Sequence, residues 1–184
     1  NGSKLYITSA EYAGVFVVWA VTDPEAPKGK GISCFLVEGG TPGLVIGKAE
    51  RKMGQHGSVT NEVHFEDCRL PADAILGKEN EGFRIAVKEL CGGRIGIAAV
   101  ALGIARAAMD AANAYVKERR QFGQRIADMQ GIQWTVADRE TELEAARLLT
   151  LHAAWLKEAG RPFAKAASMA KLYASEAAQR ATYS

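Results

Sequence analysis

The stretch Gly92–Gly123, GGRIGIAAVALGIARAAMDAANAYVKERRQFG, decides the fold. Apolar side chains recur in it three and four positions apart, which is the spacing of one face of an α-helix. Gly92 and Gly93 are expected to let the backbone turn sharply or approach a ligand, and Gly123 to end the helix in a left-handed conformation. The predicted buried face carries Ile97, Val100, Ile104, Ala108, Ala111 and Tyr115.

The chain before this helix has the pattern of β-strands. Short runs rich in β-branched and aromatic residues are separated by Pro, Gly and Asp, as is typical of strands joined by turns. Strands at this spacing favour an antiparallel sandwich or barrel. The predicted strands are Lys4–Thr8, Val15–Val21, Ile32–Glu38, Leu44–Lys48 and Val63–Phe65.

From about residue 80 onward the apolar period becomes helical. Besides the central helix, we expect helices at Phe83–Leu90 and Ile132–Ala159, and a further one beginning at Phe163. Their Ala-rich faces suit a closely packed, antiparallel four-helix bundle. The predicted fold class is therefore α+β, with a β domain at 1–77 and a helical domain at 78–184. Glu140, Glu142 and Glu144 are expected on the solvated face of the Ile132–Ala159 helix.

The composition is that of an ordinary globular chain, with 184 residues, 48% hydrophobic content and a net charge of +2. Because it has no uninterrupted apolar run of about eighteen residues, we predict no membrane span, and the small charge argues against nucleic-acid binding. The chain begins without Met and ends in helical composition, so we expect a fragment of a longer protein. No metal site or disulfide framework is expected from Cys34, Cys68, Cys91, His56, His64 and His152, whose scatter fits no ligand spacing and favours a reducing compartment.

An ordered set of segments resembles the acyl-CoA dehydrogenases, and within them the short-chain, butyryl-CoA type. The resemblance covers nearly the whole chain with matching spacing, and it implies the later part of the middle β domain joined to most of the C-terminal helical bundle domain. The segments begin at Asn1 (NGSKLYIT), Lys28 (KGKGISCFLVE), Thr41 (TPGL), Val63 (VHFEDCRLP), Ile75 (ILGKENEGF), Gly92 (GGRIGIAAVALGIA), Glu118 (ERRQFGQRIADMQGIQ) and Glu144 (EAARLLT).

The resemblance also implies a reaction. In the family, a Glu removes the α-proton of a fatty acyl-CoA thioester while the β-hydrogen leaves as hydride to FAD, which gives a trans-2-enoyl-CoA. Most members place this Glu beyond the point where this chain ends, and one branch places it immediately before the equivalent of Arg94. Gly93 stands there in this chain. We therefore assign no catalytic residue, expect the base in a missing C-terminal segment, and expect these residues alone to be inactive.

The family positions that contact FAD fall on two stretches. Tyr6, Ile7 and Thr8 match the strand that lines the flavin ring, with Tyr6 where the family usually has Trp; ordinary β packing is the alternative interpretation. Arg119 and Gln130 match positions that reach the FAD of a neighbouring protomer, with Gln121 and Phe122 as secondary contacts. A guanidinium suits pyrophosphate oxygens. The alternative is that these cations only neutralise the helix dipole.

The substrate side of the family site matches Gly92, Gly93 and Arg94. Arg94 is expected either to orient the site or to form a structural ion pair. An acidic residue usually stands at the position of Cys91, so this chain departs from the family pattern there. A buried Cys usually acts as a small apolar residue.

The partners implied by the resemblance are an acyl-CoA substrate, an electron-transfer flavoprotein and further copies of the chain, as a homotetramer formed through the C-terminal helices. The expected location is the cytoplasm of a bacterium, or the mitochondrial matrix of a eukaryote. Two alternatives stay open: a homologue that no longer dehydrogenates, with a flavin- or DNA-associated or structural role, and an acyl-CoA oxidase.

Overall fold

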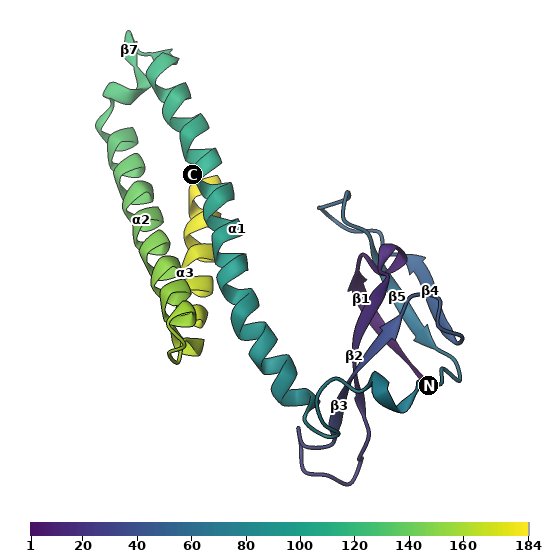
Figure 1. Cartoon of the computed structure of the whole chain (residues 1–184). Coiled ribbons are helices and arrows are strands. Elements are labelled where there is room, and N and C mark those ends of the chain that lie inside the picture. Colours follow the sequence, from purple (N-terminus) through teal and green to yellow (C-terminus); the bar gives the residue numbers. More distant parts are fainter. Residues whose placement is uncertain (184) are drawn as a thin grey trace. The chain divides into compact units, whose positions relative to one another are not determined.

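The structure is a computed structural model that describes residues 1–183, and Figure 1 shows its elements. Contacts divide the chain into two compact units, Asn1–Ala86 and the residues from Val87 onward. The β-strands of the first unit and the helices of the second confirm the predicted α+β class.

The first unit contains two antiparallel sheets. β1 (Gly2–Thr8), β5 (Thr60–Phe65) and β4 (Leu44–Ala49) form one sheet with β5 in the centre, and β2 (Val15–Val21) pairs with β3 (Ile32–Glu38) in the other. Two short 3₁₀ turns, η1 and η2, complete the unit; they lie at Ala10–Tyr12 and Ala72–Ala74. Each predicted strand is therefore present, within three residues of its expected start.

Side chains point alternately to the two faces of each strand, and those on the inner faces build the core of this unit. Val63 and Phe65 face the core from β5, while His64 between them points to the other face, as the sequence predicts. Val63 is 1% exposed and packs with Val37 of β3 and Phe16 of β2. The two sheets thus bury a shared apolar layer.

The second unit consists of three long helices and a small hairpin among the residues described. α1 is Gly82–Glu118, α2 is Gln130–Glu158 and α3 is Ala164–Tyr183. The start of α1, up to Ala86, belongs to the first unit. The predicted break between Phe83–Leu90 and the central helix is wrong, because α1 runs without interruption through Gly92 and Gly93. Glycines lower helix stability without stopping a helix that is held by packing.

The central helix also ends earlier than predicted. α1 stops at Glu118, and the chain continues into β6 (Arg120–Gln121) and β7 (Gln124–Arg125). Phe122 (φ 51°) and Gly123 (φ 79°) form the turn between them. Positive φ at both central residues is the geometry that a two-residue hairpin requires. Gly123 is left-handed as expected, but it serves the hairpin and not a helix end. The 3₁₀ turn η3 (Ile126–Asp128) then leads into α2.

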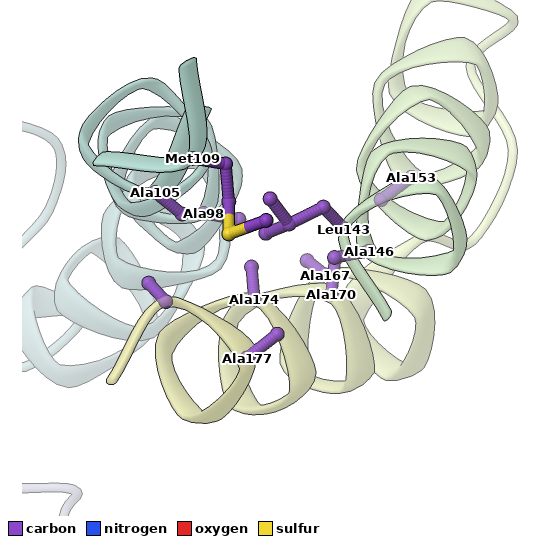
Figure 2. Packing of buried hydrophobic residues seen from close by; sticks show 11 residues of the cluster. Ala98, Ala105, Met109, Leu143, Ala146, Ala153, Ala167, Ala170, Ala174 and Ala177 are labelled. Atoms are coloured by element: carbon purple, nitrogen blue, oxygen red, sulfur yellow. The ribbon is translucent and has the colours of Figure 1, made fainter. Parts of the chain in front are cut away.

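Small residues form the core of the helical unit (Figure 2). Ala98 and Ala105 of α1 are at most 1% exposed, and Met109 and Leu143 fill the space between α1 and α2. The remaining buried positions are mainly alanines of α2 and α3: Ala146, Ala153, Ala167, Ala170, Ala174, Ala177 and Ala178. Alanine side chains let helices approach closely, as the sequence predicted.

The buried face of α1, however, is not the predicted one. Ile97 (54% exposed), Val100 (57%) and Ile104 (53%) lie at the surface, and so does Tyr115. The helix turns its alanines and Met109 inward instead, because a close helix–helix contact selects for size and not for hydropathy. In α3, Leu172 is likewise exposed.

Ion pairs between helices correct a second expectation. Glu140 of α2 accepts hydrogen bonds from Arg106 (2.8 Å) and Asn113 (3.0 Å), both on α1. Glu142 is bound to Arg180 of α3. These two glutamates therefore hold helices together, and only Glu144 matches the predicted solvated position.

One helix has the composition of a membrane span. An 18-residue window of α1 has a mean hydropathy of 1.6, with 17% of it buried, so the prediction of no such segment does not hold by length and composition. A single helix of this kind is weak evidence for a membrane, since the core helix of a soluble protein meets the same test.

Candidate cofactor-binding site

The predicted flavin strand lies at an open edge of a sheet. Tyr6, Ile7 and Thr8 are the last residues of β1, which pairs only with β5. Tyr6 is 71% exposed, Ile7 is partly buried in the core and Thr8 is exposed. The strand is therefore anchored by Ile7 and presents an aromatic ring and a hydroxyl to the surroundings.

A β-bulge gives Tyr6 its orientation. Lys4 pairs with Val63 and Ile7 with Asn61, so β1 has one residue more than β5 over this interval. Tyr6 lies within the bulge with φ of 60°, a left-handed conformation that is unfavourable for a bulky residue. Bulges occur often beside functional sites, where they redirect a side chain.

The same part of β5 faces a second bulge. On the other side of the sheet, Ile46 pairs with Val63 and Ala49 with Asn61, so β4 also carries one extra residue. A Cβ atom on Gly47 would lie 3.0 Å from Glu62 Cβ, which leaves little space for any other residue there. Both strands that flank β5 are therefore bulged at the same level.

The second set of predicted cofactor contacts lies on the hairpin. Arg119 follows α1, Gln121 ends β6, Phe122 is the turn residue with 92% exposure, and Gln130 begins α2. These four residues lie at the end of the unit where α1 leads into α2 (Figure 1). All four side chains are exposed.

The charges of the hairpin distinguish Arg119 from its neighbour Arg125. Arg125 binds Asp128 through two hydrogen bonds of 3.0 and 3.1 Å, and this contact lowers the pKa of the Asp128 carboxyl. Among residues 1–183, no ion pair is found for Arg119. Its backbone is fixed at both ends, because its N–H donates to Tyr115 O and its carbonyl accepts from the Ile126 N–H, each at 2.9 Å. A free guanidinium on a fixed backbone can bind an anion.

The predicted substrate segment lies elsewhere on α1. Gly92 and Gly93 adopt helical geometry and form no turn. Arg94 donates to Cys91 Sγ at 3.3 Å, one helical turn away, and the ion pair expected as an alternative is not found in the described part of the chain. A Cβ on Gly92 would lie 3.2 Å from Lys157 Nζ, so α2 brings a cation to this segment that sequence analysis missed.

The predicted residues thus fall into three groups. Along one helix, Gly92 and Glu118 are separated by about 39 Å at 1.5 Å per residue, so the substrate segment and the hairpin are at opposite ends of the helical unit. Tyr6, Ile7 and Thr8 belong to the other unit. The substrate segment and the hairpin therefore do not form one compact site within the helical unit.

The residues present suit a flavin dinucleotide. Taken separately, the first unit offers an exposed aromatic ring and a hydroxyl on a fixed strand, which can contact a ring system, and the second unit offers a free guanidinium with amide side chains, which can bind a pyrophosphate. A metal is not supported, since no group of three or more His, Cys, Asp and Glu in residues 1–183 could hold one.

Comparison with known families finds two matching domains, one in each half of the chain. Residues 80–184 match the C-terminal domain of the acyl-CoA dehydrogenases, and residues 1–68 match their middle domain. The chain therefore belongs to the acyl-CoA dehydrogenase family.

Individual members of the family are similar to this chain over nearly its whole length. The chain is 53% identical over 183 residues to acryloyl-CoA reductase (NADH) of Anaerotignum propionicum, covering 99% of this chain and 46% of the relative. Butyryl-CoA dehydrogenase from Megasphaera elsdenii is 46% identical, with a TM-score of 0.94 over 98% of this chain and 47% of that one. A structure of PigA with FAD and proline is 31% identical, with a TM-score of 0.94 over 98% and 47%. The chain spans about half the length of these relatives.

Proposed function

We propose that this chain is part of an FAD-dependent acyl-CoA dehydrogenase that converts short, straight acyl-CoA thioesters to trans-2-enoyl-CoA. The likeness to butyryl-CoA dehydrogenase, 46% identical over 98% of this chain, is the observation that carries the proposal. Bound FAD would accept the β-hydrogen as hydride. The proposal gives the role of catalytic base to none of the described residues.

The residues of this chain would bind and orient. Tyr6 offers its exposed ring to the flavin, and Thr8 offers a hydroxyl to the ring edge, while partly buried Ile7 fixes the strand between them. Arg119 would bind the pyrophosphate, with Gln121 and Gln130 as further hydrogen-bond donors. Gly92, Gly93 and Arg94 would lie on the substrate side. Each role is the one that the family resemblance implies, and the exposure of Tyr6, Thr8 and Arg119 supports it on the cofactor side.

The partners follow from the same proposal. The parent protein would pass its electrons to an electron-transfer flavoprotein and form a homotetramer, in a bacterial cytoplasm or a mitochondrial matrix. Nucleic acid is not part of the proposal, because the net charge is only +2.

FAD binding by the full chain tests the cofactor role. Titration with FAD, followed by flavin fluorescence, should show weak saturable binding for the wild type. Arg119→Ala should raise the Kd about tenfold, since a charge-assisted hydrogen bond is lost. Arg120→Ala is the matched control, because Arg120 is adjacent and also exposed. Loss of its charge should change the Kd less than about twofold, since salt and water screen a charge of this kind. Equal losses in both variants would indicate unspecific attraction and refute the assignment of Arg119.

A second candidate is reduction of an enoyl-CoA. It is favoured by the 53% identity to acryloyl-CoA reductase (NADH). Both reactions need the same arrangement of thioester and flavin, so the residues assigned above would serve either direction. Assay of the parent enzyme for acryloyl-CoA-dependent NADH oxidation and for butyryl-CoA oxidation separates the two candidates.

A further inference from the structure

Asn61 on the central strand β5 is buried with an unpaired oxygen. Its side chain is 1% exposed, and its Nδ2 donates to the Gly47 carbonyl at 3.3 Å. Its Oδ1 has no hydrogen-bond partner, and within residues 1–183 it is the only buried side-chain polar atom in this situation. Nearly all buried polar groups in folded proteins are paired, so an exception calls for a reason.

The position of Asn61 in the sheet accounts for the bond that its amide nitrogen makes. Asn61 pairs with Ile7 of β1 and with Ala49 of β4, which are the first paired residues after the two bulges. The Gly47 carbonyl that it binds lies inside the β4 bulge, where the regular ladder is interrupted. The Asn61 amide therefore replaces a lost ladder contact at the level where both edges of the sheet are irregular.

The β1 bulge carries its own unfavourable feature at the same level. Leu5 (53% exposed) and Tyr6 (71%) are the bulged residues, and Tyr6 has the left-handed φ of 60°. Such a conformation persists only where the surrounding structure fixes it, and it is concentrated at functional sites. An unpaired buried acceptor and a strained aromatic residue thus lie on neighbouring strands, beside the proposed cofactor surface.

We propose that Asn61 is a positioning residue for the flavin: its amide holds the β4 bulge, and through the backbone pairing of Asn61 with Ile7 this fixes the β1 bulge that turns Tyr6 outward. The inference rests on the proposed function and deepens it. Asn61 acts through Tyr6, and its unpaired Oδ1 is a cost of the bulged form in the free chain.

The decisive variant is Asn61→Leu in the full chain, which keeps a side chain of similar size and removes both amide groups. Three quantities are measured: the Tm without FAD, the Kd for FAD, and hydrogen exchange of the backbone amides at residues 5–7. Val63→Ala is the matched control, a buried residue two positions away on β5 with no polar role. It should lower the Tm and leave the Kd for FAD unchanged.

We expect Asn61→Leu to keep the Tm within about 3 °C of the wild type, because the loss of a weak hydrogen bond is offset by removal of an unpaired acceptor. Hydrogen exchange of the amides at residues 5–7 should accelerate. The Kd for FAD should rise about fivefold, which corresponds to the binding free energy of one aromatic contact. Tyr6→Ala should give the same loss, and the double variant should bind no more weakly than Tyr6→Ala alone.

Additive losses in the double variant, or an unchanged Kd in Asn61→Leu, would overturn the inference. If the parent protein does not bind FAD, the proposed function fails by itself. The exchange measurement still decides the structural part, since it needs no ligand: unchanged exchange at residues 5–7 refutes a role for Asn61 in holding Tyr6.

Discussion

Glu142 Oε1 accepts a hydrogen bond from Arg180 Nε at 2.9 Å, and this contact joins α2 to α3. The other carboxylate oxygen accepts from Arg139 Nη1 at 2.8 Å. The Glu142 side chain is 24% exposed and that of Arg180 is 38% exposed, so water screens the pair only in part. One carboxylate thus connects two helices whose buried residues are mostly alanines.

Glu142→Ala should lower the free energy of unfolding of the helical unit by about 1–2 kcal/mol, because two charge-assisted hydrogen bonds are lost from a partly buried site. Urea denaturation followed by circular dichroism measures the change. Glu144→Ala is the control, since Glu144 pairs with Arg147 on the same helix and both side chains are half exposed. Its effect should be clearly smaller than that of Glu142→Ala, because water screens the Glu144–Arg147 pair. Equal losses in the two variants would contradict the special role of Glu142.

The alanine core predicts a strong dependence on side-chain volume. Ala170 of α3 is fully buried among close helices, so Ala170→Leu should cost about 1–3 kcal/mol through overpacking. Leu172→Ala on the same helix removes an exposed side chain and should change stability by about 0.5 kcal/mol or less. Thermal unfolding of the two variants compares the positions directly. A larger loss for Leu172→Ala would show that the exposed face is covered in solution.

The contrast between the two units explains what the sequence could predict. In β2 and β3 both strand bounds were predicted without error, because alternating β-branched runs between turn residues signal strands locally. In α1 the helix was predictable but its buried face was not. A pattern based on hydropathy selects Ile97 and Ile104, whereas close packing buries Ala98 and Ala105.

The candidate site was predictable only as far as its residues resemble the family. Tyr6 and Thr8 were identified in this way, but the left-handed conformation of Tyr6 depends on a mismatch in strand register. Asn61 gave no signal, since its role depends on bulges in β1 and β4 that are separated from it by up to fifty-six positions in the chain. Such pairings between distant strands are not encoded in any local motif.

The exposed apolar side chains of the helices predict self-association. Ile97, Val100 and Ile104 on α1 and Leu148 and Leu151 on α2 are each more than half exposed. Large exposed apolar surfaces usually mark interfaces. We expect light scattering to show an oligomer whose fraction rises with concentration, and Ile104→Glu to shift it toward the monomer. Val45→Glu, at an exposed apolar position of β4, is the control and should leave the distribution unchanged. A monodisperse monomer at all concentrations would refute self-association.

The three thiols should differ sharply in reactivity. Cys34 is fully buried and Cys91 is 8% exposed, while Cys68 is partly exposed. Since only the thiolate reacts, and burial raises the pKa of the Cys34 thiol above its ordinary value of 9.0, a disulfide reagent at pH 8 should modify Cys68 first. Cys68→Ser should remove the fast phase, and unfolding should expose all three thiols. A fast phase that survives in Cys68→Ser would contradict the burial of the other two.

The same thiol predicts a pH dependence of stability. Above pH 9.0 the unfolded chain loses the Cys34 proton while the folded chain keeps it, because the pKa is raised in the folded state. The unfolded state is then favoured, so the contribution of the protonated thiol is complete below pH 9.0 and falls as the pH rises beyond it. Cys34→Ser does not titrate in this range and should weaken the decline relative to the wild type. Urea midpoints measured between pH 7 and pH 10.5 give the comparison, and parallel curves for the two proteins would show that Cys34 does not contribute to the alkaline loss of stability.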